Sequence, residues 1–156
     1  MSQQLWLLRH GEAEPHGAVE DRDRRLTARG ERQSAAAGAA LARLGLEFAL
    51  ALTSPRVRAR DTARLACEAL GVDAAEHEPL SEGFDCQEAL ALLAGQDDDA
   101  RVLLVGHEPD LSQVVHDLTG ARIDLKKGGI ATVRVKGGGG ELLVLLRPRE
   151  LETLAV

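Results

Sequence analysis

Leu5-Trp6-Leu7-Leu8-Arg9-His10-Gly11 is the stretch that decides the fold, because an apolar run leads directly into a cation and an imidazole. Two later stretches repeat the arrangement: residues 49–53 lead into Ser54-Pro55-Arg56-Val57-Arg58-Ala59, and residues 102–105 lead into Gly106-His107-Glu108-Pro109. In an open α/β sheet, ligands bind in the crevice outside the carboxyl ends of parallel strands. We therefore expect the residues beyond three strand ends to converge on one site that handles phosphate.

Helical patterns separate these apolar runs. We expect strands at 3–8, 48–53 and 101–106, and helices that end at Gly45, Gly71, about residue 93 and Gly120, the first of them capped by Thr27. Residues 130–135 and 142–146 flank a glycine-rich tip and predict an antiparallel hairpin. Strands that alternate with helices indicate an α/β fold: a three-layer α/β/α sandwich with a mostly parallel central sheet and a C-terminal antiparallel hairpin.

Composition limits the class of protein. The 156 residues suit one domain, and a hydrophobic fraction of 44% with only 2% aromatics predicts a core of Leu, Val and Ala. A net charge of −6 disfavours a nucleic-acid-binding surface, whereas sixteen arginines suit a discrete anion pocket. No apolar stretch is long enough to span a bilayer, and the first residues lack the pattern of a secretory signal, so we expect a cytoplasmic protein that binds no membrane.

Metal chemistry is not expected. Cys67 and Cys86 lack the paired spacing of zinc sites and are interpreted as core thiols. His107 and Glu108 lie near Asp110, but no second cluster matches them, and Asp110 is interpreted as a helix N-cap. We expect neither a metal nor an organic cofactor.

The three strand ends carry the groups that phosphoryl transfer needs, namely an in-line nucleophile and fixed positive charge around the phosphoryl oxygens. A neutral His10 imidazole can attack phosphorus and form a phosphohistidine intermediate. Arg9 and Arg58 are the candidate clamp, and their charges should lower the pKa of His10. His107 is the candidate for a further donor to the phosphoryl group.

The pattern resembles the signature of the histidine phosphatase superfamily, also called phosphoglycerate-mutase-like. The resemblance rests on Leu8-Arg9-His10-Gly11, on residues 54–63, on Val105-Gly106-His107 and on Leu26-Thr27-Ala28-Arg29-Gly30. Within the superfamily, the chain looks most like the small SixA-type phosphohistidine phosphatases. The resemblance implies that His10 accepts the phosphoryl group and that Arg9, Arg58 and His107 form the phosphate pocket. From the length of the chain, we expect residues 1–156 to form a single histidine-phosphatase domain without a large cap insertion.

Many members of this family use a carboxyl group as proton donor, for which Glu82 and Asp85 are the candidates here, without a choice between them. A phosphohistidine substrate leaves as an imidazole and needs less help from an acid. Residues 11–26 and 71–100 leave little chain for a lid, so we expect an open pocket. An open pocket favours a phosphorylated side chain of another protein as substrate, and the resemblance to SixA-type phosphatases implies a protein of the histidine phosphotransfer type.

Two other functions remain open. One is a small-molecule phosphomonoesterase of the same superfamily, and the other is a non-catalytic module that binds phosphoproteins. Arg56 and Arg60 are expected at the surface, and residues 21–25 are expected to form a solvated loop. Lys126-Lys127 and the basic residues of that loop are candidates for guiding an acidic partner protein.

Overall fold

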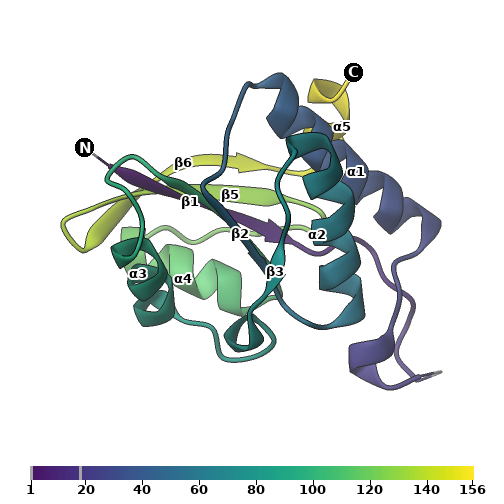
Figure 1. Ribbon diagram of the computed structural model, residues 1–156. Helices are drawn as coiled ribbons and strands as arrows, with labels where there is room; N and C mark the ends of the chain where they lie inside the picture. The colour runs from purple at the N-terminus through teal and green to yellow at the C-terminus, as the bar shows by residue number, and fades with distance from the viewer. Residues whose placement is uncertain (1, 18) are drawn as a thin grey trace.

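The computed structural model describes residues 2–17 and 19–156, in which six strands form one sheet in the order β3-β2-β4-β1-β5-β6 (Figure 1). Strands β1 to β4 are mutually parallel, whereas β5 runs antiparallel to both β1 and β6. The mostly parallel sheet with a C-terminal hairpin is thus confirmed. The strands are β1 (Gln3–Arg9), β2 (Leu50–Thr53), β3 (Ala75–Glu76), β4 (Arg101–Gly106), β5 (Ile130–Lys136) and β6 (Gly139–Leu146).

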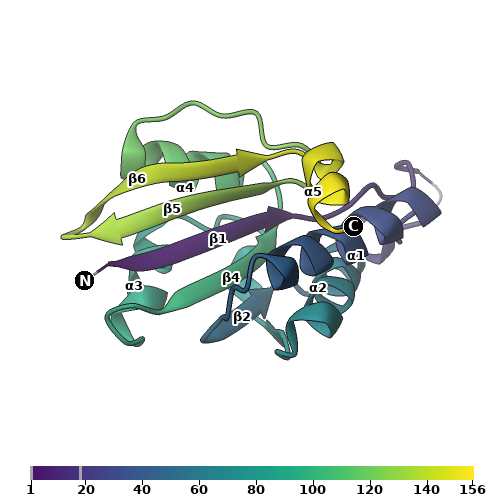
Figure 2. The ribbon, with the colours of Figure 1, turned by 90° about the horizontal axis from the view of Figure 1, so that it is seen from above.

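Helices cover both faces of the sheet, which confirms the three-layer arrangement (Figure 2). Helices α1, α2 and α5 pack on one face, and α3 and α4 pack on the other. None of the helices that the structure describes has the length and apolar character required to cross a bilayer. The helices are α1 (Ala28–Arg43), α2 (Val57–Leu70), α3 (Cys86–Ala94), α4 (Asp110–Thr119) and α5 (Pro148–Leu154), with short 3-10 turns η1 (Asp21–Asp23) and η2 (Glu78–Leu80).

Strand β1 contributes side chains to both hydrophobic clusters, one on each face of the sheet. Successive side chains of a strand point to opposite faces. Leu5 and Leu7 accordingly join the cluster beneath α3 and α4, while Trp6 and Leu8 join the cluster beneath α1, α2 and α5. Burial on both faces explains why this strand reads as a continuous apolar run. The run ends at Arg9, where the strand leaves the core.

Helices α1 and α2 approach each other closely because small residues line their contact. A Cβ atom on Gly38 would lie 2.1 Å from the carbonyl oxygen of Ala66, so only glycine fits there. The neighbouring Ala37 and Ala63 are fully buried. This tight pair fixes the position of α2, whose first turn carries Arg58.

Most predicted element ends match the structure. Helix α2 spans Val57–Leu70 and is terminated by Gly71 in the left-handed conformation, and Thr27 caps α1 by accepting a hydrogen bond from the Gly30 amide. The N-cap prediction for Asp110 is wrong: Pro109 occupies the cap, and the Asp110 carboxylate instead accepts a hydrogen bond from the Gly83 amide. The two-residue strand β3 and the helix α5 were not predicted.

Candidate active site

Three neighbouring parallel strands bring the predicted residues to one edge of the sheet. Strand β4 lies between β1 and β2, and the register pairs Arg9 with Gly106 and Thr53 with Val105. His10, Ser54 and His107 each follow the last residue of one of these strands. The convergence expected from the sequence is therefore present in the structure.

His10 is held in a defined orientation. Its side chain is buried, with 6% of the residue exposed, and its backbone amide donates to the carbonyl of Gly106 at 3.1 Å. The ring Nδ1 lies 2.7 Å from the carbonyl oxygen of Gly11. Because a carbonyl oxygen can only accept, Nδ1 carries the proton, and in the neutral ring Nε2 keeps its lone pair. The lone pair of the neutral His10 ring is thus on Nε2, the nitrogen that a nucleophilic attack would use.

His107 lies beside His10, with the two ring centroids 5.2 Å apart. Its Nε2 atom is 2.7 Å from the hydroxyl of Ser54, which also accepts a hydrogen bond from the Arg56 amide. This arrangement favours donation by the Ser54 hydroxyl to Nε2, which places the imidazole proton on Nδ1. Nδ1 of His107 is buried and has no partner among the described residues. It is a donor available to an anion.

The two predicted arginines also carry buried donors that lack partners in the described part of the chain. Arg58 is 5% exposed; its Nη1 and Nη2 atoms donate to Asp21, and its Nε has no partner among the described residues. Arg9 donates through Nη1 to the carbonyl of Leu125 at 2.9 Å, and its Nε is likewise buried and unpaired within the described part of the chain. A buried donor without a partner costs about 1–3 kcal/mol, which an anion that accepts from it would offset.

Asp21 links three arginines at the edge of this site. Its carboxylate contacts Arg24 at 2.8 Å, Arg56 at 2.9 Å and Arg58 at 3.1 Å. Burial raises the pKa of Asp21, but hydrogen bonds from Arg24 and Arg58 and the charges of Arg58 and Arg56 outweigh it and lower the pKa to about 2. Asp21 is therefore ionised near neutral pH and sets the direction of the Arg58 guanidinium.

The expectation of a solvated loop at residues 21–25 is thus wrong in part. Arg24 is 6% exposed and donates to Asp21 and to the carbonyl of Glu14. Arg56 is half-buried and donates to Asp21 and to the hydroxyl of Ser81, whereas Arg60 is exposed as expected. A sequence in which Asp and Arg alternate is typical of a solvated loop. Only the fold of the loop brings Asp21 into contact with Arg58.

Both imidazoles are neutral near pH 7. Burial, followed by the charges of Arg58, Arg9 and Lys127, lowers the pKa of His10 to about 3 against the smaller raising effect of its hydrogen bond to Gly11. Burial, followed by His10 and Arg58, lowers the pKa of His107 to about 3. The direction agrees with the sequence-based expectation for His10, but the largest cause is burial and not the arginine charges.

These depressed pKa values predict a loss of stability in mild acid. An unfolded histidine has a pKa of about 6.5, so below that pH the unfolded chain binds protons that the folded chain does not. The free energy of unfolding should therefore fall as pH decreases from 6.5 towards 4, by up to about 1.4 kcal/mol per pH unit for each histidine. Urea denaturation between pH 7.5 and 5 measures this slope.

The matched variant is His10→Gln/His107→Gln, which removes both titrating groups and keeps polar side chains. Its unfolding free energy should depend less steeply on pH than that of the parent. Equal slopes for the two proteins would contradict the assignment of neutral buried imidazoles.

Backbone contacts hold the loop after His10. A Cβ atom on Gly11 would lie 2.6 Å from the carbonyl oxygen of Gly30, so this position requires glycine. The Gly11 amide donates to the hydroxyl of Thr62, which itself donates to the carbonyl of Arg58. Ser34 of α1 donates to the same Thr62 hydroxyl. One buried hydroxyl therefore connects the His10 loop to the turn of α2 that carries Arg58.

The two candidate proton donors differ in their surroundings. Asp85 is the N-cap of α3, and its carboxylate accepts a hydrogen bond from the Glu88 amide at 2.9 Å. Glu82 is exposed and directly follows Ser81, which accepts the hydrogen bond from Arg56. No contact in the described part of the chain joins either carboxylate to His10 or His107.

Sequence reasoning missed Asp21, Ser54 and Thr62 as members of the site. Ser54 had a usable signal, since it directly follows a predicted strand end. Thr62 stands four residues after Arg58 on a helix, a spacing that places the two on one face. Asp21 had no signal of its own, because its role depends on how the loop folds back.

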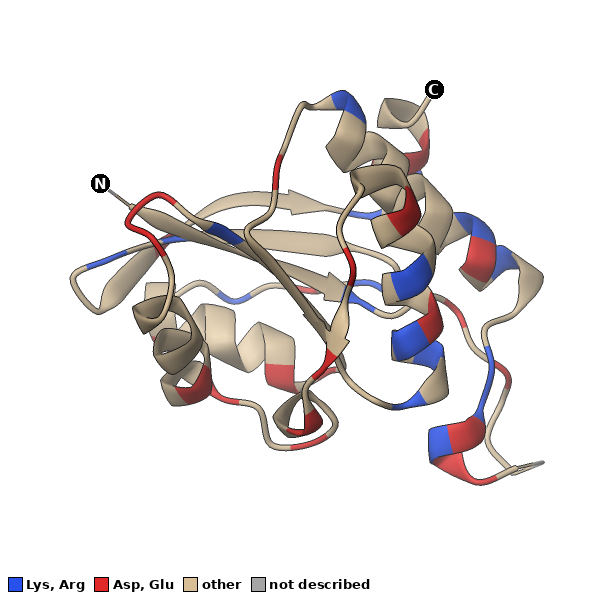
Figure 3. Ribbon diagram, in the orientation of Figure 1, with Lys and Arg blue, Asp and Glu red and all other residues tan. Residues whose placement is uncertain are grey.

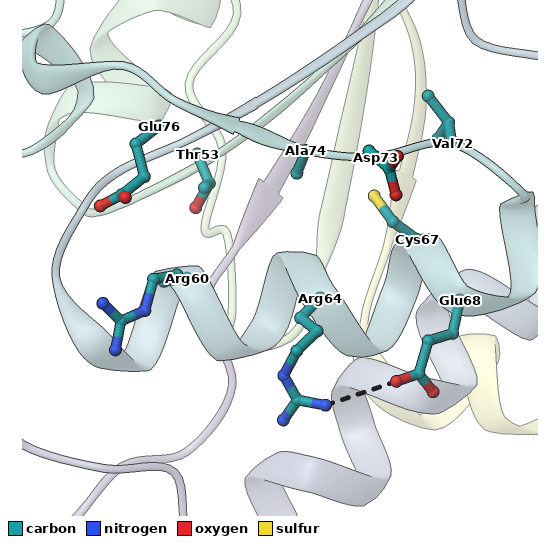
Figure 4. A pocket seen from close by; sticks show the side chains of 9 residues that line it. All are labelled: Thr53, Arg60, Arg64, Cys67, Glu68, Val72, Asp73, Ala74 and Glu76. Atoms are coloured by element: carbon teal, nitrogen blue, oxygen red, sulfur yellow. Dashed lines mark hydrogen bonds and ion pairs between the residues drawn. The ribbon is translucent and has the colours of Figure 1, made fainter.

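Another cavity lies between α2 and β3 and contains none of the predicted site residues (Figure 4). Cys67 faces it, and burial followed by the charge of Asp73 raises the pKa of this thiol to about 11. Arg64 and Glu68 pair at 3.4 Å on the outer side. A protonated buried thiol is a poor nucleophile, which fits the interpretation of Cys67 as a core residue. Within residues 2–17 and 19–156, no three His, Cys, Asp or Glu side chains are grouped so that they would hold a metal ion.

Comparison with known proteins identifies relatives of the chain. Residues 5–90 match the sequence model of the histidine phosphatase superfamily (branch 1). An uncharacterised protein of Picosynechococcus sp. is 38% identical over 143 residues, which cover 84% of each chain.

Two solved structures share the fold of this chain. The protein histidine phosphatase SixA, solved with tungstate, has a TM-score of 0.85 and 26% identity over 95% of this chain and 99% of its own. A histidine-to-alanine mutant of phosphoserine phosphatase from Entamoeba histolytica, in complex with phosphoserine, has a TM-score of 0.76 and 18% identity over 96% of this chain and 99% of its own. The second similarity concerns the fold alone.

Proposed function

The chain belongs to the histidine phosphatase superfamily, and from this premise we propose that it hydrolyses phosphohistidine on a protein through a covalent phosphohistidine intermediate at His10. The observation that carries the proposal is a set of three buried donors without partners among the described residues: Nε of Arg9, Nε of Arg58 and Nδ1 of His107. The His107 ring lies beside that of His10, and the charges of both arginines act on His10. Three N–H donors match the three equatorial oxygens of a phosphoryl group in transfer.

The reaction proceeds in two displacements. In the first, the His10 Nε2 lone pair attacks phosphorus, the bond from phosphorus to the substrate imidazole breaks, and that imidazole leaves with its bonding electron pair and takes up a proton. In the second, water attacks the phosphorus of phospho-His10, inorganic phosphate leaves, and the Nε2 lone pair is restored. Arg9, Arg58 and His107 donate to the phosphoryl oxygens in both steps. The residues need no cofactor for this chemistry.

The proton for the leaving imidazole has two candidate sources. We favour Glu82, because the carboxylate of Asp85 already accepts a hydrogen bond as the cap of α3. An imidazole is a weaker base than an alkoxide and needs less help from an acid.

The choice of a protein substrate is supported by the likeness to the protein histidine phosphatase SixA and by the short segments around the site. Residues 11–26 and 71–100 hold little chain that could close over a small molecule. The phosphoserine phosphatase with the same fold keeps a small-molecule phosphomonoesterase as the second candidate. We further propose that residues 1–156 act as a single domain in the cytoplasm and that the protein binds neither nucleic acid nor membrane.

Substrate preference tests the proposal directly. We expect kcat/KM on a phosphohistidine-containing histidine phosphotransfer protein to exceed that on phosphoserine, sugar phosphates and nucleotides by at least about 100-fold, since small esters lack the rest of the binding surface. Release of inorganic phosphate under neutral conditions is the measurement. A strong preference for one small ester would assign the second candidate function instead, and binding without turnover of any substrate would assign a non-catalytic module.

A further inference from the structure

A basic cavity of about 500 Å³ adjoins the proposed active site. Its walls come from the end of β1, from α1, from the segment before β5 and from α5, which packs against α1 (Figure 2). Two carboxylates, Glu12 and Glu152, also line it. Its cationic residues outnumber them and are Arg9, Arg29, Lys126, Lys127, Arg147 and Arg149.

The cavity is continuous with the catalytic residues. Arg9 lines the cavity and also belongs to the proposed phosphate pocket. Lys127 precedes Gly128, whose amide donates to the carbonyl of His10 at 2.9 Å. The charge of Lys127 contributes to the lowered pKa of His10. A molecule whose phosphoryl group reached His10 would therefore pass beside the cations of this cavity.

The cavity cations are only weakly neutralised by the chain itself. Arg29 lies 4.0 Å from Glu12, and Arg147 and Arg149 share the single carboxylate of Glu150. Lys126 pairs with Asp124 at 2.8 Å, whereas Lys127 forms no ion pair with any residue that the structure describes. Exposed pairs of this kind contribute about 0–1 kcal/mol, so an incoming anion can replace them at small cost.

Charge is distributed unevenly between the two faces of the sheet (Figure 3). Residues 76–119, which include α3 and α4, contain eleven Asp and Glu residues but only Arg101 among basic residues. The cavity lies on the side of α1 and α5, in a chain whose net charge is −6. Electrostatic complementarity would thus direct an acidic partner to the cavity and away from α3 and α4.

We propose that this cavity binds the carboxylate side chains of an acidic segment next to the phosphorylated histidine of the substrate protein. This inference rests on the proposed function. The cations come from several separate elements and, apart from Arg9, are reached from solvent. Such a spread of long, exposed side chains fits several carboxylates along a polypeptide better than one compact anion. A cavity of this volume accommodates several side chains.

The experiment uses two fluorescein-labelled peptides, each with a central histidine, flanked by Asp and Glu in one and by Lys in the other. Binding of the unphosphorylated peptides is measured by fluorescence anisotropy, and kcat/KM is measured on the phosphorylated forms. We expect the full-length protein to bind the acidic peptide at least about 10-fold more tightly and to hydrolyse it with at least about 10-fold higher kcat/KM. Both preferences should decrease with added salt, since exposed charges are screened beyond about 8 Å at 0.15 M.

The variant Arg29→Glu/Arg149→Glu reverses two cavity charges that contact neither His10 nor Arg58. It should lose the preference for the acidic peptide. It should keep its activity on phosphoramidate, because this small donor does not extend into the cavity while its phosphorus is at His10. Arg64→Glu/Arg122→Glu changes the net charge equally outside the cavity and should keep the preference.

The outcomes separate this inference from the proposed function. Hydrolysis of both phosphopeptides without preference, or a preference that survives Arg29→Glu/Arg149→Glu, would overturn the docking site and leave the activity standing. Selective binding of the acidic peptide without hydrolysis of either phosphopeptide would overturn the activity and support the docking site. Equal binding of the two unphosphorylated peptides by the parent would also exclude the site.

Discussion

His10→Ala is expected to lower turnover by at least about 10⁴-fold, because removing a nucleophile from a covalent mechanism removes the pathway itself. Burial of the ring keeps it neutral at pH 7, and the Nδ1 hydrogen bond to Gly11 orients it and leaves the lone pair on Nε2. Intact-protein mass spectrometry after brief exposure to phosphoramidate, with a neutral quench, measures the intermediate. The parent should carry an acid-labile phosphate adduct, and His10→Ala should carry none.

The control for this experiment is His116→Ala, which removes an exposed imidazole on α4 away from the strand ends. It should turn over and form the adduct like the parent. A thermal denaturation curve for each variant separates lost chemistry from lost folding. Turnover by His10→Ala within about 10-fold of the parent would show that His10 is not the nucleophile.

Arg58→Ala is expected to lower kcat/KM by about 10³-fold, since a fixed guanidinium stabilises the charge on the phosphoryl oxygens in the transition state. Arg58 reaches the site from the first turn of α2 and is oriented by two hydrogen bonds to Asp21. Arg58→Lys should recover only part of the activity, because an ammonium does not reproduce the planar fork of the guanidinium. Steady-state kinetics on one phosphohistidine substrate compares the three proteins.

Tungstate binding, followed by the rise in melting temperature, provides a second readout that does not depend on catalysis. The parent should be stabilised by tungstate, and Arg58→Ala should be stabilised much less, since a ligand stabilises only the state that binds it. Arg60→Ala is the matched control, because Arg60 is exposed two residues further along the same helix. Equal losses in Arg60→Ala and Arg58→Ala would mean that general positive charge, rather than a specific clamp, supports the reaction.

Local signals account for the parts of the fold that the sequence predicted well. The bounds of α2 follow from its apolar spacing and from Gly71, whose positive φ ends the helix. Strand β3 was not predicted because two residues are too few to show the alternation of apolar and polar side chains that indicates a strand. Helix α5 had signals in Pro148 at its start and in Glu150, which accepts a hydrogen bond from the Arg147 amide. Those two residues indicate a helix start even where the segment is short.

The sequence by itself determined which residues stand at the ends of the strands. A continuous apolar run indicates a strand that is buried on both faces of a sheet. Arg9 and His10 directly follow such a run and therefore lie where that strand ends. The same argument places His107 at the end of β4. The order of the strands then brings these ends to one edge.

Only the tertiary structure decided the pKa values and the ion pairs of those residues. The pKa values of His10 and His107 depend mainly on burial, which is created by packing between elements distant in the sequence. The ion pair of Asp21 with Arg58 joins residues 37 positions apart. The basic cavity likewise combines α1 with α5, near opposite ends of the chain. Periodicity predicts which way a side chain faces, but pairing and desolvation depend on distances of a few ångströms that exist only after the chain has folded.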